Sequence, residues 1–424
     1  MNGPLIGCIA DDYTGGTDVA AALRRVGLTT VLLFGPPDDD QPLLDCNAVV
    51  VALKTRTVAA ADAVEQTLEV YRWLQRHGAQ RTYFKYCSTF DSTDDGNIGP
   101  VTDALLDAAD AAVTLICPAS PEHGRTTYLG HHFVGAALLS ESSMRHHPLT
   151  PMTDPNLVRV LSRQTPHRVG LLSAATTRQG PATAEAAVAA LVADGVRHIV
   201  VDIIDDEDLL VAAQAGRDMS VLTGGAGLAR ALGTVLREVA VAGATSDDTH
   251  ATLPGGPGLI LAGSCSVTTL GQVAAAKAVF PAYRLDPAAT PDPQQLLESA
   301  TRWLHDNLGK GPVLIYSSAD AEQRVAAVAA MGPETAEILE RTLGRLAATA
   351  VDLGIRRVVV AGGETSGAVT NALNVRTVLV AGEADTGVPW CITTDPGRPL
   401  VLLLKSGNFG RPDLLVRAME GTTS

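Results

Sequence analysis

The chain has 424 residues, a formal net charge of -14 at pH 7 and 46% hydrophobic residues. This length predicts two or three domains, each large enough to bury a core. The negative charge, with no basic stripe carrying interleaved aromatic residues, argues against a nucleic-acid partner. The six cysteines form no C-x-x-C pair, which excludes a recognisable zinc knuckle or disulfide framework and fits a reducing compartment. Neither a signal-peptide pattern nor an apolar stretch of membrane-spanning length is present, so we expect a cytoplasmic protein without a membrane partner.

The first half of the chain alternates short apolar runs with Ala-rich amphipathic segments. This alternation predicts βα units that form a largely parallel sheet covered by helices. We expect strands at 6–10, 30–34, 48–53, 82–85, 113–117, 168–172 and 198–201, and helices from 18, near 59–77 and at 182–193. The interval 139–165 differs, and its proline and histidine content indicates an irregular excursion or lid.

A second alternating series follows a segment rich in turn formers. It predicts strands at 259–262, 313–316, 358–360 and 400–404, and a long helix around 333–353. We therefore expect an α/β fold with two α/β lobes, mainly parallel sheets and a cleft between them. The predicted boundaries are 1–240 for the first domain, 241–257 for the linker and 258–424 for the second domain.

Polar side chains follow three predicted strands of the first lobe, at the edge where open α/β sheets bind ligands. Arg56 and Lys85 are suited to a carboxylate, while aspartates and Asn97 accept or orient hydroxyl groups. This set favours a polyhydroxy acid as the ligand. The alternatives are that Asp11 or Asp12 caps the helix expected near residue 17, and that Lys85 is an ordinary salt-bridged lysine. The predicted substrate-binding residues are Asp11, Asp12, Arg56, Lys85, Asp91, Asn97 and Arg125.

Two further features of this lobe stay open at the level of sequence. Arg125, in a polar loop after a strand, either contacts substrate or stabilises its own loop. His146 and His147 are adjacent, so on an extended segment they point to opposite sides and rarely ligate one ion together. We predict no metal site there, and a role in a lid or an interface is the alternative.

Three glycine- and hydroxyl-rich loops follow strands of the second lobe. Glycines allow close backbone approach, and a new helix offers unpaired N–H groups to phosphate oxygens. Neither a Walker loop nor the G-x-G-x-x-G fingerprint is present. Cys265 lies between serines without a recognisable histidine partner, so we do not expect a thiolate nucleophile. The predicted nucleotide-binding residues are Ser264, Ser266, Gly362, Gly363, Glu364, Thr365, Ser366, Lys405, Gly407 and Asn408.

Taken in order, the motifs resemble those of the four-carbon acid sugar kinase family over nearly the whole chain. They are IADDYTG at 9–15, KYCSTFDST at 85–93, GNIGP at 96–100, GGETSG at 362–367 and LKSGNFG at 404–410. Within that family, HHPLTPMTD at 146–154 and NLVR at 156–159 are most similar to the 3-oxo-tetronate kinases. One departure is Gly16, where the family pattern has Ala.

The resemblance implies a substrate lobe followed by a nucleotide lobe, and transfer of phosphate from ATP to the terminal hydroxyl of a four-carbon sugar acid. The 4-phosphate product enters carbohydrate catabolism. We expect Lys405 and the glycine loops to hold the triphosphate, with Mg²⁺ bridging its oxygens. Asp12 or Asp91 is expected to deprotonate the C4 hydroxyl, while Arg56 and Lys85 bind the C1 carboxylate and lobe closure excludes water.

Several alternatives remain. A threonate or erythronate kinase of the same family fits the same motifs. An NAD-dependent hydroxy-acid dehydrogenase is a rival, but the chain lacks the dinucleotide fingerprint. A non-catalytic sugar-acid sensor is a second rival, but the two glycine loops argue against it. The stereochemistry and oxidation state of the acid, the Mg²⁺ ligands and the oligomeric state, with a homodimer as one option, are not given by the sequence.

Overall fold

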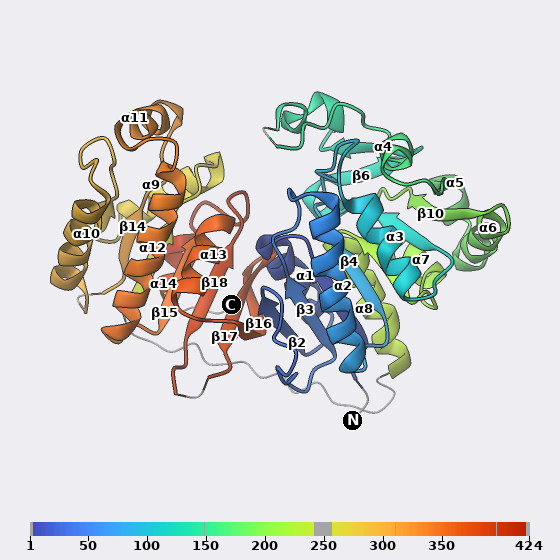
Figure 1. Ribbon diagram of the computed structural model, residues 1–424, viewed down its shortest axis with the longest axis horizontal. Helices are drawn as coiled ribbons and strands as arrows, with labels where there is room; N and C mark the ends of the chain where they lie inside the picture. The colour runs from blue at the N-terminus through green and yellow to red at the C-terminus, as the bar shows by residue number, and fades with distance from the viewer. Residues whose placement is uncertain (1–2, 148, 241–256, 310, 396, 421–424) are drawn as a thin grey trace. The chain divides into compact units, whose positions relative to one another are not determined.

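A computed structural model describes residues 3–147, 149–240, 257–309, 311–395 and 397–420. The chain divides into two compact units, residues 1–247 and 248–424. Of the predicted linker 241–257, all but Pro257 lies outside the described residues. Each unit contains its own sheet and its own covering helices (Figure 1). No helix in the described part of the chain is both long and apolar enough to cross a bilayer.

Unit 1 is built on eight parallel strands in the order β2-β3-β1-β4-β11-β5-β10-β9. Helices cover both faces, so the strands are apolar runs without alternation, as the fully buried β3 illustrates. Every strand predicted for this half is present. The strands are β1 (Ile6–Ala10), β2 (Thr30–Phe34), β3 (Ala48–Ala52), β4 (Thr82–Lys85), β5 (Thr114–Cys117), β9 (Arg168–Leu172), β10 (Val196–Val201) and β11 (Val221–Gly224).

The helices of unit 1 lie in two layers, as right-handed crossovers require when the chain moves both ways along the sheet. On one face α1 packs against α8, α8 against α7 and α7 against α6, and on the other α2 packs against α3 and α3 against α4. The helices are α1 (Tyr13–Arg25), α2 (Ala60–Arg76), α3 (Ile98–Ala108), α4 (Leu157–Gln164), α5 (Ala174–Thr177), α6 (Pro181–Ala193), α7 (Asp206–Ala215) and α8 (Ala226–Ala240).

A small antiparallel sheet, not predicted from the sequence, leaves the main sheet of unit 1 after β5. It consists of β6 (Arg125–Tyr128), β7 (His131–Val134) and β8 (Ala137–Leu138), and short 3-10 helices follow within 139–146. Asp202, fully buried after β10, accepts hydrogen bonds from the N–H groups of Leu129, Gly130 and Ala174. One carboxylate therefore fastens this sheet to the main fold.

Unit 2 has a seven-stranded sheet in the order β13-β14-β12-β15-β18-β17-β16. The first five strands pair in parallel, and β17 is antiparallel to both of its neighbours, β18 and β16. The predicted strands are present, whereas the β17–β16 hairpin was not predicted. The strands are β12 (Gly258–Ala262), β13 (Ala282–Arg284), β14 (Val313–Tyr316), β15 (Arg357–Ala361), β16 (Thr377–Asp385), β17 (Val388–Thr393) and β18 (Val401–Lys405).

Helix α12 packs against α13 and α10, and α14 packs against α9, so both faces of this sheet are covered as well. The helices are α9 (Val267–Lys277), α10 (Pro293–Asn307), α11 (Ala321–Met331), α12 (Thr335–Asp352), α13 (Gly363–Ala372) and α14 (Leu414–Glu420). The strand orders have one consequence for function. The carboxyl ends of β3, β1 and β4 are neighbours in unit 1, and those of β12, β15 and β18 are neighbours in unit 2.

Candidate functional site

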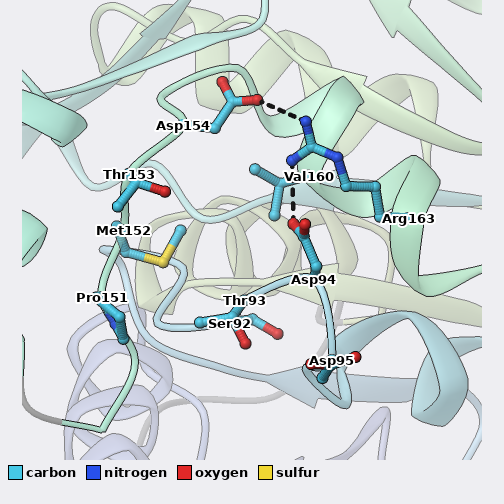
Figure 2. Close-up of a pocket in the computed structure, with 10 residues that line it drawn as sticks. All are labelled: Ser92, Thr93, Asp94, Asp95, Pro151, Met152, Thr153, Asp154, Val160 and Arg163. Carbon is cyan, nitrogen blue, oxygen red and sulfur yellow. Dashed lines mark hydrogen bonds and ion pairs between the residues drawn. The ribbon is translucent and has the colours of Figure 1, made fainter.

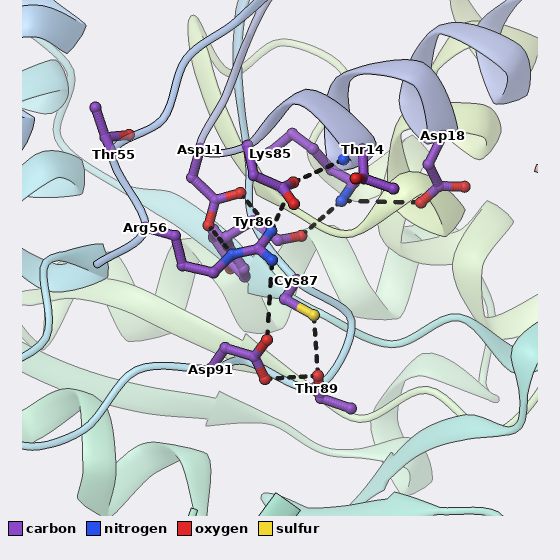
Figure 3. Close-up of polar contacts among 12 residues, drawn as sticks. Asp11, Thr14, Asp18, Thr55, Arg56, Lys85, Tyr86, Cys87, Thr89 and Asp91 are labelled. Atoms are coloured by element: carbon purple, nitrogen blue, oxygen red, sulfur yellow. Dashed lines mark hydrogen bonds and ion pairs between the residues drawn. The ribbon is translucent and has the colours of Figure 1, made fainter. Parts of the chain in front are cut away.

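In unit 1 the loops after β1, β3 and β4 meet around the guanidinium of Arg56 (Figure 3). Arg56 Nε donates to Asp11 Oδ2 at 2.9 Å and Nη2 donates to Asp11 Oδ1 at 2.7 Å, which makes a bidentate pair. Nη2 also donates to Asp12 Oδ1 at 2.7 Å, and Nη1 lies 3.9 Å from Asp91 Oδ2. The structure thus gathers three of the predicted acidic residues around one predicted cation.

Burial shapes the electrostatics of this cluster. Desolvation raises the pKa of the Asp11 carboxyl, and the paired guanidinium opposes that rise. Desolvation by itself lowers the pKa of Arg56, but the charges of Asp11 and Asp12 hold that pKa well above its ordinary value. Arg56 is therefore a fixed cation, and most of its charge is already balanced by aspartates.

Asp12 is the N-cap of α1, because its backbone is extended and its Oδ1 accepts a 2.6 Å hydrogen bond from the Gly15 N–H. The helix begins at Tyr13, four to five residues before the predicted start at 17–18, since the capping carboxylate nucleates the turn through the glycines. Asp12 therefore has a structural role at this position in addition to any role in binding.

Asp91 lies in a loop whose backbone is unusual. Phe90 and Asp91 have φ values of 67° and 46°, in the left-handed region that non-glycine residues avoid at a cost of about 1–3 kcal/mol. Phe90 is buried with its ring edge-on to Tyr86, and Thr89 Oγ1 donates to Asp91 Oδ1 at 2.7 Å. Such strain persists only where surrounding contacts determine it, and it is concentrated at functional sites.

His132, on the small antiparallel sheet, supports this loop from another side. Its ring is fully buried, with Nε2 2.8 Å from the carbonyl oxygen of Ser88 and Nδ1 3.0 Å from Thr127 Oγ1. Burial lowers the pKa of His132 to about 4, so the ring is neutral at physiological pH and Nε2 carries the proton that it donates. Sequence reasoning missed this residue, because a histidine in an isolated HHFV run gives no sign of its distant partner.

Lys85 and Gly15 lie beside the same cluster. The Lys85 ammonium is buried, donates to the Tyr86 carbonyl at 2.8 Å and lies 3.8 Å from Asp18 Oδ2. A Cβ added at Gly15 would lie 2.5 Å from Asp12 Oδ1, 3.2 Å from Lys85 Nζ and 3.7 Å from Arg56 Nη2. Glycine is therefore needed at position 15, because a side chain there would overlap the capping carboxylate of Asp12.

The remaining predicted residues of unit 1 occupy other places. Asn97 is buried, and its Nδ2 donates to the Thr55 carbonyl at 2.7 Å, so it fixes the loop that carries Arg56. Arg125 donates through Nη1 to the His123 carbonyl, within its own loop. His147 Nδ1 accepts from the Thr150 N–H and faces the Thr150 hydroxyl, while His146 is exposed. Within the described residues, no three His, Cys, Asp or Glu side chains are placed to hold a metal ion.

A hollow of about 510 Å³ adjoins the loop after Asp91 (Figure 2). Arg163 crosses one side of it, donating to Asp94 at 3.0 Å and to Asp154 at 3.3 Å. The carboxylates that line the hollow outnumber the one lining cation, Arg163, which disfavours an anionic ligand inside the hollow. The lining residues are Ser92, Thr93, Asp94, Asp95, Pro151, Met152, Thr153, Asp154, Val160 and Arg163.

In unit 2 the loops after β12, β15 and β18 lie side by side. The Ser264 N–H donates to Ala361 O at 3.2 Å, and the Gly362 N–H donates to Lys405 O at 3.0 Å, which ties each loop to the next strand. Gly362 has a φ of 132° and caps α13 without a side chain. The N-cap residue of α13 therefore has no side chain to offer the first turn, and such a helix end suits an anion.

The third loop holds Lys405 and Gly407. A Cβ at Gly407 would overlap Ser264 Oγ, so only glycine permits this approach of the two loops. Lys405 is only 1% exposed, and burial lowers its pKa to about 8. The lysine therefore lies beneath the loop, whereas the sequence suggested a side chain reaching outward to phosphate.

An apolar hollow of about 170 Å³ continues from these loops toward the carboxyl ends of β14 and β13. Sequence reasoning missed it, since its walls come from separate segments that carry neither glycine signals nor charge patterns. It shares Gly263, Cys265 and Thr365 with the loops. The other lining residues are Arg284, Leu285, Pro287, Ser317, Ala319, Gln323, Arg324, Ala327, Val328, Thr335, Ala336, Leu339 and Glu340.

Comparison with known proteins assigns a class to each unit. Residues 6–232 match the model of a sugar-binding N-terminal domain, and residues 259–415 match that of a nucleotide-binding C-terminal domain. The chain therefore belongs to the four-carbon acid sugar kinase family, whose members combine these two domains.

Curated relatives match along the full length. A protein from Burkholderia multivorans named 3-oxo-tetronate kinase is 48% identical over 424 residues, covering 99% of this chain and 98% of its own. One of the same name from Cupriavidus necator is 47% identical, with 98% and 97% of the two chains covered.

Solved structures agree in fold. A Salmonella typhimurium LT2 protein, provisionally described as a tRNA synthase, has a TM-score of 0.89 at 39% identity over 99% of both chains. A Haemophilus influenzae protein has a TM-score of 0.81 at 38% identity, covering 98% of this chain and 99% of its own.

Proposed function

We propose that this protein is an ATP-dependent kinase that phosphorylates the C4 hydroxyl of a 3-oxo-tetronate, giving the 4-phosphate for carbohydrate acid catabolism. The name shared by full-length relatives at 48% and 47% identity supports this substrate. The observation that carries the proposal is the cluster around Arg56, which presents carboxylates and cations at one edge of the sugar-binding domain.

The second unit is proposed to bind ATP across two connected regions. The apolar hollow suits the adenine base, while the loops after β12, β15 and β18 suit the phosphates. This places Ser264, Gly362 and Gly407 near the triphosphate. Mg²⁺ commonly binds through substrate phosphates with one or two carboxylates, so the lack of a three-acid cluster among the described residues fits an ion carried largely by the nucleotide.

Asp91 is the stronger candidate for the base that deprotonates the C4 hydroxyl. Asp12 Oδ1 already accepts hydrogen bonds from Gly15 and Arg56, and Asp12 caps α1. Asp91 Oδ1 accepts from Thr89, whereas Oδ2 lies 3.9 Å from Arg56, which leaves that oxygen better placed to accept a substrate hydroxyl. We therefore assign proton abstraction to Asp91 and orientation of the substrate to Asp12.

The C1 carboxylate of the substrate is proposed to approach Lys85 and Arg56. These are the two cations predicted from the sequence to bind it, and both lie close to the Gly15 backbone. Asp11 and Asp12 contact the Arg56 guanidinium at 2.7 Å, whereas Asp18 lies 3.8 Å from Lys85 Nζ, so Lys85 is proposed to supply the larger share of the attraction. Asn97 acts on the substrate indirectly, by holding the loop after β3.

The decisive experiment measures Mg²⁺-dependent ADP release from ATP with 3-oxo-tetronates, threonates and erythronates of both hands. Stimulation by a 3-oxo-tetronate supports the proposal. Stimulation only by a threonate or erythronate would contradict the 3-oxo-tetronate assignment and make that acid the substrate. ATP binding without stimulation by any acid contradicts the substrate class. ATP dependence also favours a cytoplasmic location, and light scattering during size-exclusion chromatography distinguishes a monomer from a homodimer.

A further inference from the structure

The carbonyl oxygen of Gly407 accepts hydrogen bonds from three side chains. Ser266 Oγ donates at 2.5 Å, Thr269 Oγ1 at 2.8 Å and Lys405 Nζ at 3.2 Å. A carbonyl oxygen normally accepts one or two hydrogen bonds through its two lone pairs. Because three donors converge on this oxygen, the peptide group is held in one orientation. One donor is the N-cap residue of α9, the second is in the first turn of α9, and the third is at the end of β18.

Thr269 is the centre of this arrangement. Its hydroxyl donates to the Gly407 carbonyl and accepts from Lys405 Nζ at 2.9 Å, while its own N–H donates to Ser266 Oγ at 3.1 Å. The side chain is fully buried. One turn later, Gln272 Nε2 donates to the carbonyls of residues 409, 410 and 411 at 3.1, 3.0 and 2.9 Å. One face of α9 therefore holds the whole loop after β18.

The orientation of the Gly407 carbonyl determines where the next amide points. In a trans peptide the C=O and N–H groups point in opposite directions, and the described chain has no cis peptide. Since the carbonyl faces α9, the Asn408 N–H points away from α9. Within the described residues this N–H has no hydrogen-bond acceptor, and Asn408 is exposed. Gly407 itself lies against Ser264, in the loop after β12.

We propose that Thr269 is a positioning residue for ATP, because it holds the Gly407 carbonyl and thereby presents the Asn408 N–H to a phosphate oxygen. The inference rests on the nucleotide-binding role proposed above for the second unit. A backbone N–H fixed before the ligand arrives binds an anion without the cost of reorganising the loop. Thr269 acts through the loop and does not itself touch the nucleotide.

The test compares Thr269→Val with Thr269→Ser in the full-length protein. Valine keeps the branched shape but removes the hydroxyl, whereas serine keeps the hydroxyl. Thr269→Val is expected to raise the KM for ATP and the Kd for ADP about tenfold, with the KM for the acid within about twofold of wild type. Thr269→Ser is expected to restore nucleotide binding to within about threefold of wild type.

Thr342→Val is the matched control. Thr342 is buried in α12, and its hydroxyl bonds the carbonyl of Ile338 in its own helix. This variant is expected to bind nucleotide normally even if its Tm falls. If Thr269→Val does not fold, Thr269→Ala removes the same hydroxyl without placing a methyl against Lys405.

Calorimetry with ADP separates the two possible failures. No binding by the wild-type protein contradicts the nucleotide role itself. Wild-type binding with unchanged affinity in Thr269→Val overturns the positioning inference and leaves that role intact. Equal losses in the valine and serine variants also overturn it, because packing and not the hydroxyl then matters.

Discussion

Gly16 in α1 and Ala52 at the end of β3 are in such close contact that a methyl group added to Gly16 would lie 2.5 Å from the Ala52 Cβ. Both residues are buried. The motif resemblance led us to expect alanine at position 16, and in this chain Ala52 fills the space that such a methyl group would need. The contact with Ala52 thus accounts for glycine at this position of the chain.

We expect Gly16→Ala to destabilise the protein, because an overpacking cost of about 1–3 kcal/mol exceeds the helix-propensity gain of about 1 kcal/mol. Ala52→Gly should also destabilise it when made alone. The double variant should be more stable than the sum of the single effects predicts, with a coupling of about 1 kcal/mol or more. Thermal and urea unfolding of all four proteins measure this coupling, and additive effects would contradict it.

Asp91→Asn is expected to lower kcat by about 10²–10⁴-fold with little change in the KM for the acid, since a general base is lost while a hydrogen-bonding amide remains. Asparagine tolerates the left-handed backbone of residue 91 and so preserves the loop. Asp12→Asn is the comparison, because asparagine is also a good N-cap. Its kcat should fall less than that of Asp91→Asn in steady-state assays. The reverse order would assign the base to Asp12.

ATP binding is expected to take up protons at pH 8. Burial lowers the pKa of Lys405 from its ordinary 10.5 to about 8, so the free protein has lost a large part of this charge at that pH. A bound polyphosphate stabilises the ammonium and raises the pKa again, which makes binding weaken as the pH rises through 8.

Calorimetry in buffers of different ionisation enthalpy measures this uptake directly. We expect roughly half a proton per nucleotide at pH 8 and little at pH 6, where Lys405 is protonated in both states. Lys405→Met should abolish the difference between buffers. Uptake that persists in this variant would place the titrating group elsewhere.

Ala336→Trp is expected to fill the apolar hollow of unit 2 and to raise the KM for ATP about tenfold or more, because the base is excluded. Ala336 is exposed, so a large side chain there does not disturb the core. The KM for the acid should not change. Ala329→Trp, on an exposed part of α11 outside the hollow, is the matched control, and equal effects in the two variants would argue against a base site here.

Much of the fold was predictable because its parallel strands are buried on both faces. Strand β4 (Thr82–Lys85) matches the predicted 82–85, and β2 matches the predicted 30–34. The β16–β17 hairpin was not predicted, since Thr377–Asp385 is half-exposed and passes through a glycine at 382. A strand of that kind lacks the continuous apolar run on which the other assignments rest.

Strand order explains why the loops of the candidate site were predictable as neighbours, whereas side-chain contacts were not. Arg56 follows β3 and Asp11 follows β1, and the two strands are adjacent. That Arg56 is already paired with two aspartates depends on rotamers that no local pattern encodes. Lys405 shows the same limit, because a lysine beside a glycine loop looks exposed in sequence and is buried in the fold.

A single atom, Ser266 Oγ, accepts from the Thr269 N–H at the start of α9 and donates to the Gly407 carbonyl 141 residues away. Fraying of that helix end and release of the loop are consequently one opening event. In hydrogen exchange, the Thr269 amide should report on the loop after β18, and a bound nucleotide should slow its exchange by stabilising the closed form. The loop after β18 is therefore expected to open and close together with the first turn of α9.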